Sequence, residues 1–209
     1  MQTGQYVDAD DVRRAAPDAV VIATGARARL DGGQRHRPGL HIEGLAQRPV
    51  LSSEDVLSRP REQLGDSAVV LDDVGHYEGI AVAEYLIQRG LRVSYVTRHA
   101  AFAPLMDACF RAGPAYARLH RTGRFTAYTR ATLARVESRS ATLFDPAQDA
   151  APQTVPADTL VLIGFNEPNS ELRDALGDDV AAVHLIGDAL SPRFIEAAIA
   201  EGYHTGLAL

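Results

Sequence analysis

The chain has 209 residues, of which 46% are hydrophobic and 23% are charged, and its formal net charge is −6. These proportions are typical of a globular protein long enough to bury a core in one large domain or two small ones. The basic residues are all arginines, scattered through an acidic chain, so no nucleic-acid partner is expected. No apolar run approaches the length of about 18 residues that a membrane span needs, so no membrane association is expected.

The cysteine and histidine content excludes several kinds of site. A single cysteine, Cys109, rules out an internal disulfide and any Cys-x-x-Cys metal or redox pair. The histidines lack the His-x-x-x-His spacing of a helical metal site, so no metal ligand is predicted. Residues 1–11 show no basic region followed by an apolar one, and so no secretory signal. We therefore expect a cytoplasmic protein, and the exclusive use of arginine suggests a GC-rich bacterial genome.

The first predicted element is a buried strand. Residues 18–26 (DAVVIATGA) form a short apolar run, rich in β-branched side chains, that ends near Gly25. The polar stretch 27–65 that follows contains several glycines and prolines, which predicts loop and linker with one short helix from Ser53.

A βαβ unit is predicted next. SAVVL (67–71) and LRVSYVT (91–97) are predicted strands, and the segment between them predicts a helix from about Gly79 to Arg89 with one apolar face. Because a strand, a helix and a strand within about 30 residues need a crossover connection, the two strands are expected to be parallel.

The rest of the chain alternates between short helices and strands. Prolines break residues 101–120 into short helical pieces, and the alternation in 124–138 and 140–145 predicts antiparallel strands. Two further apolar runs and a final helix follow, at 159–165, 181–190 and 192–209. ATGA and IGD end the strands at 19–23 and 183–187, and we expect these two strands to share one sheet although the βαβ unit lies between them.

Three motifs carry a resemblance to a known family. ATGA (23–26) and LIGDALSPRFIEAAIAEGY (185–203) resemble the crossover and closing FAD motifs of flavoproteins in which an NAD(P)-type domain is inserted into an FAD-type domain. DDVGHYEGIAVAEYL (72–86), supported by GFNEPNSEL (164–172), is more specific. It resembles the C-terminal half of the trimethylamine dehydrogenase, histamine dehydrogenase and 2,4-dienoyl-CoA reductase family (NADH:flavin oxidoreductase, old yellow enzyme-like).

The resemblance implies an α/β fold with two dinucleotide-binding (Rossmann-like) domains. Residues 1–65 are expected to be a partial FAD/ADP-binding-type domain and linker, 66–158 an inserted, degenerate NAD(P)-type domain, and 159–209 the return to the first domain. The first FAD βαβ, with its Gly-x-Gly-x-x-Gly turn, is expected to be missing.

The resemblance also implies cofactors. FAD or ADP is expected in the intact protein, with weak or absent binding by this chain, and the candidate cofactor-binding residues are Ala23, Thr24, Gly25, Ala26, Gly187 and Asp188. Asp188 could meet a flavin hydroxyl or cap the final helix, and Thr24 with Gly25 could form a plain tight turn.

The family's N-terminal barrel, which carries FMN, a 4Fe–4S cluster and the substrate chemistry, is expected only as a separate domain or subunit. The cluster alone would need four thiolates, and this chain has one cysteine. An electron-transfer flavoprotein is a further possible partner. No catalytic residue is predicted in this chain.

The stretch 72–79 (DDVGHYEG) takes the place of the glycine-rich turn on which a pyrophosphate would bind. Counting back from Gly79, the two earlier glycine positions are held by Val74 and His76, whose side chains would fill the space of the phosphates. The alternative, in which Gly75 serves as one of the glycines after a loop insertion, stays open.

Three carboxylates, those of Asp72, Asp73 and Glu78, also lie near this turn. At an effective dielectric of about 20, each like-charge pair near 4 Å costs about 4 kcal/mol. The loop is therefore predicted to bind neither NADH nor NADPH.

The second strand of the βαβ unit ends in Thr97-Arg98-His99, so the ribose-binding carboxylate of an NAD site is absent. Arg98 could meet a 2′-phosphate, as in NADP sites, or simply be solvated. The pair His76–Tyr77 could act in acid–base chemistry, but we expect it to point into the vacated cleft and close it.

Together these features predict the nucleotide-binding-type C-terminal module of a flavin-dependent oxidoreductase, similar to amine dehydrogenases or enoate reductases and catalytically silent alone. Two alternatives stay open: an NAD(P)H-dependent flavin reductase, and a ligand-free scaffold or interaction module.

Overall fold

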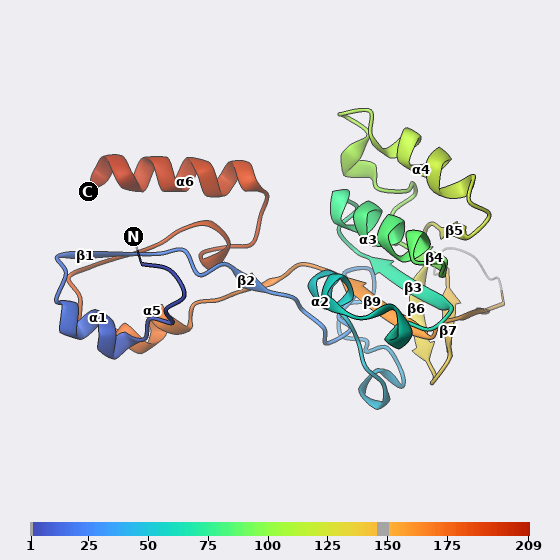
Figure 1. Cartoon of the computed structure of the whole chain (residues 1–209), viewed down its shortest axis with the longest axis horizontal. Coiled ribbons are helices and arrows are strands. Elements are labelled where there is room, and N and C mark those ends of the chain that lie inside the picture. Colours follow the sequence, from blue (N-terminus) through green and yellow to red (C-terminus); the bar gives the residue numbers. More distant parts are fainter. Residues whose placement is uncertain (1, 146–150) are drawn as a thin grey trace. The chain divides into compact units, whose positions relative to one another are not determined.

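The computed structural model describes residues 2–145 and 151–209 (Figure 1). The helices and strands are α1 (Ala9–Ala15), β1 (Ala19–Ile22), β2 (Ala26–Arg27), α2 (Ser53–Ser58), β3 (Ser67–Asp72), α3 (Tyr77–Gln88), β4 (Arg92–Val96), α4 (Ala112–His120), β5 (Phe125–Tyr128), β6 (Thr132–Val136), β7 (Ser140–Phe144), β8 (Gln153–Pro156), β9 (Thr159–Ile163), β10 (Glu167–Pro168), α5 (Glu171–Leu176), β11 (Ala182–Leu185) and α6 (Ile195–Ala208). Within the described ranges, no helix is long and apolar enough to cross a membrane.

The chain divides into two compact units. The outer unit comprises Met1–Arg27 and Asn166–Leu209, and the inner unit comprises Ala28–Phe165. The inner unit is therefore one continuous segment inserted between the two halves of the outer unit.

A parallel sheet of four strands forms the centre of the inner unit. Its order is β5-β4-β3-β9, and α3 connects β3 to β4 as the βαβ pattern predicts. The prediction of antiparallel pairing was wrong for residues 125–128, because β5 pairs parallel to β4. The physical reason is the crossover through α4, which returns the chain to the end of the sheet at which β4 begins.

Both faces of this sheet are covered, and the side chains of β3 alternate between the two covers. Ala68 and Val70 pack in a core with the apolar face of α3, whereas Val69 and Leu71 pack in a second core with β6, β7 and β8. Strands of a parallel sheet that is buried on both faces appear in the sequence as continuous apolar runs. This is why β3 is easily recognised.

The second cover is an antiparallel sheet in the order β6-β7-β8. The prediction of antiparallel strands was correct for β6 and β7, while β8 (QTVP) was not predicted. Only Val155 of β8 is buried, so this strand carries little apolar signal.

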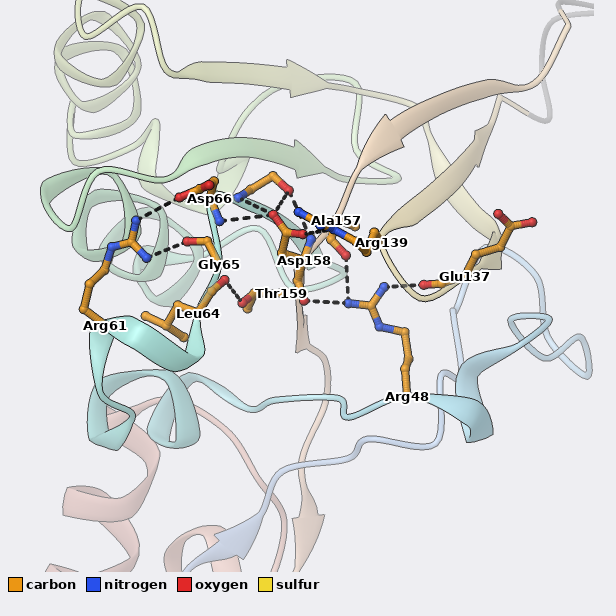
Figure 2. Close-up of polar contacts among 11 residues, drawn as sticks. Arg48, Arg61, Leu64, Gly65, Asp66, Glu137, Arg139, Ala157, Asp158 and Thr159 are labelled. Carbon is orange, nitrogen blue, oxygen red and sulfur yellow. Dashed lines mark hydrogen bonds and ion pairs between the residues drawn. The ribbon is translucent and has the colours of Figure 1, made fainter.

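A polar network closes the amino ends of β3 and β9 (Figure 2). The Asp158 carboxylate accepts hydrogen bonds from the Ser67 hydroxyl at 2.7 Å, from the Asp66 and Ser67 N–H groups at 3.1 Å, and from Arg139 Nε at 2.7 Å. The Arg48 guanidinium donates to the carbonyl oxygens of Glu137, Ala157 and Asp158. The network therefore ties the segments around Arg48 and Arg139 to the amino ends of β3 and β9.

The outer unit is built around a parallel pair of strands, β1 and β11, with Ala19 opposite Ala182 and Ile22 opposite Leu185. The expectation that these two strands share one sheet is confirmed. A short antiparallel pair, β2 with β10, extends from it. The helices α1 and α5 lie together on one side of the strand pair and α6 on the other (Figure 1).

The core of the outer unit is small. Its main cluster has three buried apolar side chains, Val12, Ile22 and Leu176, and Ala189, which precedes α6, is also buried. The final helix begins at Ile195, three residues later than predicted, and none of its residues is buried. One ridge of α6 is exposed and apolar along its whole length: Ile195, Ile199, Tyr203 and Leu207.

Candidate functional site

The loop after β3 stands where a dinucleotide phosphate would bind in a Rossmann-like domain. Asp72, the last residue of β3, is fully buried, and its Oδ1 accepts the N–H groups of Val74 at 2.9 Å and Gly75 at 2.8 Å. Its Oδ2 accepts a hydrogen bond from the Tyr95 hydroxyl on β4. Burial raises the pKa of the Asp72 carboxyl, and the hydrogen bonds from Gly75, Tyr95 and Val74 act in the opposite direction. The Asp72 carboxylate therefore accepts hydrogen bonds from the backbone N–H groups that would otherwise face a phosphate.

Two glycines are structurally required around this loop. Gly75 has φ of +79°, and a Cβ there would meet His99 Cδ2 and Pro104 Cδ, each at 2.9 Å. Gly79, in the first turn of α3, leaves no room for a side chain against Asp72 and Tyr95. Gly75 thus provides the left-handed position of the turn, and Gly79 allows α3 to pack closely on the sheet.

Asp73 and Arg98 form an ion pair beside the loop. Arg98 Nε lies 2.9 Å from Asp73 Oδ1, and the Arg98 side chain is 26% exposed. The interpretation of Arg98 as a solvated side chain was therefore wrong. It was based on local sequence, whereas the partner carboxylate is 25 residues away in the chain. The pair also neutralises one of the carboxylates that were expected to repel a pyrophosphate.

The prediction that His76 and Tyr77 close the vacated cleft was wrong for Tyr77. Its side chain is 43% exposed and lies 5.9 Å from the guanidinium of Arg111, while His76 is half-buried. The segment after β4 covers the turn instead, since the Leu105 N–H donates to the Gly75 carbonyl at 3.0 Å. That segment has no periodic sequence signal that would have revealed this role.

In the outer unit, the fold brings the six predicted cofactor-binding residues to one edge of the strand pair. β1 ends just before Ala23 and β11 ends two residues before Gly187, and the parallel register places both carboxyl ends side by side. The Ile186 N–H donates to the Ile22 carbonyl at 3.0 Å and extends the pairing to that edge. This is the position at which ligands bind in open parallel sheets.

The segment after β1 is tied to Asn169. The Thr24 hydroxyl donates to the Asn169 carbonyl at 2.6 Å, and the Asn169 N–H donates to the Gly25 carbonyl at 3.0 Å. Gly25 has φ of +74°, and a Cβ there would meet nothing within 4 Å. Ala26 then begins β2. Thr24 and Gly25 therefore lie in an irregular connection between β1 and β2 that is held by Asn169 rather than by a local turn, and the side of Gly25 is open.

Asp188 caps the turn that precedes α6. Its Oδ1 accepts the Arg193 N–H at 3.1 Å, so it does not cap the helix itself, which begins at Ile195. The carboxylate is half-buried, and in the described part of the chain no donor reaches its Oδ2. One oxygen of Asp188 is thus available to a ligand hydroxyl.

Glu201 is a site residue that the sequence did not reveal. Its Oε2 accepts the Gly187 N–H at 2.7 Å, and its Oε1 pairs with Arg193. The hydrogen bond from Arg193, with that from Gly187, lowers the pKa of the Glu201 carboxyl. The N–H of Gly187 is therefore already used within the outer unit. A carboxylate on the predicted final helix gave no sequence signal for this contact.

Over residues 2–145 and 151–209, no group of three His, Cys, Asp or Glu side chains is placed to hold a metal ion. In both units the backbone donors near the strand ends are bound by carboxylates of the chain itself, those of Asp72 and Glu201. What the outer edge offers a ligand is one carboxylate oxygen of Asp188 and the open side of Gly25.

No protein-family model matches the chain. A probable N-methylproline demethylase of Rhizobium meliloti (strain 1021) is 27% identical to it over 99 residues, which is 47% of this chain and 13% of that protein. The solved structure of histamine dehydrogenase from Rhizobium sp. 4-9 matches 98% of this chain and 32% of its own, with a TM-score of 0.88 and 22% identity. That of 6-hydroxypseudooxynicotine amine oxidase from Pseudomonas geniculata N1 matches 97% of this chain and 30% of its own, with a TM-score of 0.87 and 27% identity.

The chain thus spans about a third or less of the length of each of these proteins. Its α/β fold is that of FAD/NAD(P)-binding flavoprotein domains, as the sequence indicated. The resemblance found in the sequence is confirmed: the chain matches the C-terminal FAD/NAD-binding region of the trimethylamine dehydrogenase-like flavoproteins.

Proposed function

We propose that this chain is the nucleotide-binding-type C-terminal module of a flavin-dependent oxidoreductase related to amine dehydrogenases and enoate reductases, and that it is catalytically silent alone. The match to an amine oxidase at 27% identity supports the class of enzyme. The contacts of the loop after β3 support the proposal that the chain alone is catalytically silent. Asp72 binds the N–H groups of Val74 and Gly75, which a dinucleotide phosphate would otherwise need.

The domain arrangement that we propose is a discontinuous FAD/ADP-binding-type domain (1–65 and 159–209), interrupted by an NAD(P)-type domain (66–158) that has lost its nucleotide. The division into an inner unit and a two-part outer unit supports a discontinuous arrangement. We further propose that the first βαβ of the FAD-type domain is missing from the outer unit. The half-exposed strands of its β1–β11 pair and the apolar ridge of α6 support this, because parallel sheets are normally buried on both faces.

An adenine nucleotide or FAD, if bound, should lie at the outer edge formed by Ala23, Thr24, Gly25, Ala26, Gly187 and Asp188. The residues present fit part of such a ligand. Asp188 Oδ2 can accept a hydrogen bond from a ribose or ribityl hydroxyl, and the open side of Gly25 permits close approach. The phosphate-binding turn would belong to the missing βαβ, so we expect weak or absent binding by this chain.

The remaining chemistry is proposed to lie on other parts of the enzyme. Because the chain spans about 30% of the solved relatives, further domains are implied in the full enzyme. We propose that an N-terminal FMN barrel, as a domain or a subunit, carries the 4Fe–4S cluster and the substrate site. Electrons would then pass to an electron-transfer flavoprotein, and the enzyme would not need a nucleotide bound to its NAD(P)-type domain.

Isothermal titration of the chain with ADP, FAD, NADH and NADPH tests the proposal. We expect no saturable binding of NADH or NADPH at the loop, and weak or no binding of ADP and FAD. FAD affinity in the micromolar range or tighter would contradict the missing βαβ.

The alternative of an NAD(P)H-dependent flavin reductase makes a different prediction. Saturable NADPH binding that Arg98→Ala abolishes, with the exposed Arg92→Ala as a matched control, would favour it over a silent module. A double change of Val74→Gly with His76→Gly should leave binding poor, because the Asp72 carboxylate still occupies the loop donors. The scaffold alternative predicts no nucleotide binding by any of these variants.

A further inference from the structure

A cavity of about 360 Å³ lies in the inner unit, over the carboxyl ends of β3 and β9. Asp73, which follows β3, and Phe165, which follows β9, line its floor, and the loop 29–41 forms its wall. The sheet order β5-β4-β3-β9 makes this a switch point, because the chain continues from β3 to one side while β9 pairs on the other. Ligands of open parallel sheets bind at such points.

The wall of the cavity is held in place by buried hydrogen bonds. The side chain of Gln34, which is 4% exposed, bonds both the N–H and the carbonyl of Leu133 on β6, each at 2.8 Å. The Arg35 N–H donates to Asp73 Oδ2 at 2.9 Å. The loop is therefore fixed to β6 at Gln34 and to the end of β3 at Arg35, and the cavity is preformed.

Among the described residues that line it, the cavity has more arginines than carboxylates, in a chain whose net charge is −6. Both of its carboxylates are engaged: Asp31 accepts the Arg29 guanidinium at 2.7 and 2.9 Å, and Asp73 pairs with Arg98. Two further arginines line the same cavity, Arg35 and Arg37. In the residues that the structure describes, neither of them forms an ion pair with a carboxylate.

Aromatic rings position these two guanidiniums. Arg35 Cζ lies 3.5 Å from the centroid of the Phe165 ring, and Arg37 Cζ lies 5.6 Å from that of Phe144. Stacking on a ring fixes a guanidinium while leaving its N–H donors free for an anion. Two such forks offer the planar, multiple donors that recognise phosphate oxygens.

We propose that this cavity binds a small phosphate monoester, with its phosphate between Arg35 and Arg37. The charge supports a dianion, since a phosphate monoester carries about −1.5 to −2 at neutral pH and two arginines supply two positive charges. The volume exceeds what inorganic phosphate needs, and Pro38 and Leu40 provide apolar wall for an organic group. This site does not use the N–H donors of the loop after β3, and Arg98 does not line it but acts only through its ion pair with Asp73.

Titration of the chain with phenyl phosphate at low salt tests the proposal. We expect saturable binding that weakens roughly tenfold or more in each of Arg35→Gln and Arg37→Gln, because each removes a charge-assisted contact. Arg121→Gln, an equal change of charge on the exposed end of α4, should bind as the unmodified chain does. Arg35→Lys, which keeps the charge but loses the planar fork, should bind more weakly than the unmodified chain.

Three results would overturn the proposal: no saturable binding at millimolar phenyl phosphate, binding unchanged by both glutamine variants, or malonate binding as tightly as phenyl phosphate. Thermal unfolding of each variant verifies that the fold is intact. Arg37→Gln gives an independent measure of phosphate binding if Arg35→Gln disturbs the loop, because the N–H group that bonds Asp73 belongs to Arg35.

Discussion

The two units contain nearly the same strand in different surroundings. Residues 68–71 in β3 read Ala-Val-Val-Leu, and residues 19–22 in β1 read Ala-Val-Val-Ile. Val70 of β3 is fully buried, whereas Val21, at the equivalent position of β1, is 42% exposed. β3 has strand neighbours on both sides and covers on both faces, while β1 pairs only with β11 among the described residues. Burial of a strand is therefore decided by what covers it and not by its own sequence.

This difference predicts unequal stability. Fully burying a valine side chain contributes about 1.5–3 kcal/mol. All four apolar residues of β3, 68–71, are buried, whereas in β1 only Ile22 is. The outer unit should therefore behave as an incomplete part that gains stability when something covers β1, β11 and α6. The inner unit should behave as a complete core.

The largest expected effect is in hydrogen exchange. The amides of β3 should exchange only through unfolding of the inner unit, at a cost of roughly 5–15 kcal/mol, whereas those of β1 should exchange by local opening. Each difference of about 1.4 kcal/mol slows exchange tenfold, so the two strands should differ by several orders of magnitude. Mass spectrometry of peptides covering 67–72 and 19–22 measures this. Equal protection of the two peptides would contradict the comparison.

Removal of the Asp72 side chain should be the most damaging single change in the inner unit. Asp72→Ala leaves two backbone N–H groups and the Tyr95 hydroxyl without their acceptor, at a cost of roughly 3 kcal/mol. Asp72→Asn keeps an oxygen for both N–H groups and should cost distinctly less. Urea unfolding of both variants gives the two values, and equal losses would show that the hydrogen bonds are not what matters.

A matched pair of valine substitutions compares the two strands directly. Val70→Ala should destabilise the inner unit by about 2–3 kcal/mol, from lost transfer free energy plus the cavity that remains. Val21→Ala, at an exposed position, should change the free energy of unfolding by no more than about 0.5 kcal/mol. A large effect of Val21→Ala on this chain would mean that β1 is covered in solution.

The smallest effect concerns pH. Burial raises the pKa of the Asp158 carboxyl, but hydrogen bonds from Ser67, the Asp66 N–H and Arg139 more than offset this, so its pKa in the folded chain lies below the ordinary value. A lowered folded-state pKa contributes stability that is fully present above the unfolded pKa of about 3.9 and is lost as pH falls through the folded value.

Asp158→Asn should therefore cost roughly 1 kcal/mol at pH 7, since Arg139 is 78% exposed and its ion pair is well screened. Below pH 4 the unmodified chain should approach the variant, while between pH 5 and 7 the difference should stay constant. Urea unfolding across this range measures it. A difference that persists unchanged to pH 2 would show that the Asp158 charge is not the cause.

The candidate sites were only partly readable from the sequence. Gly79 and the strand–helix–strand pattern located the loop after β3, and ATG with IGD located the outer edge, because strand ends and glycines leave local signals. The partners of these residues lie far away in the chain. Asp72 and Tyr95 are 23 residues apart, and Thr24 and Asn169 are 145 apart. No local pattern specifies such contacts.

The sequence by itself determined the parallel βαβ unit, the burial of β3, the sharing of one sheet by β1 and β11, and the family resemblance. Apolar periodicity and turn residues encode the βαβ unit and the burial of β3 locally, whereas the shared sheet was expected from the ATGA and IGD motifs that carry the resemblance. Only the tertiary structure decided that β5 runs parallel, that Asp72 caps the loop, and that Tyr77 faces outward. The fold alone also left Val21 exposed in β1 while burying Val70 in a nearly identical tetrapeptide. These outcomes depend on which distant segment arrives beside a residue, and that is set by the packing of whole elements rather than by neighbours in the chain.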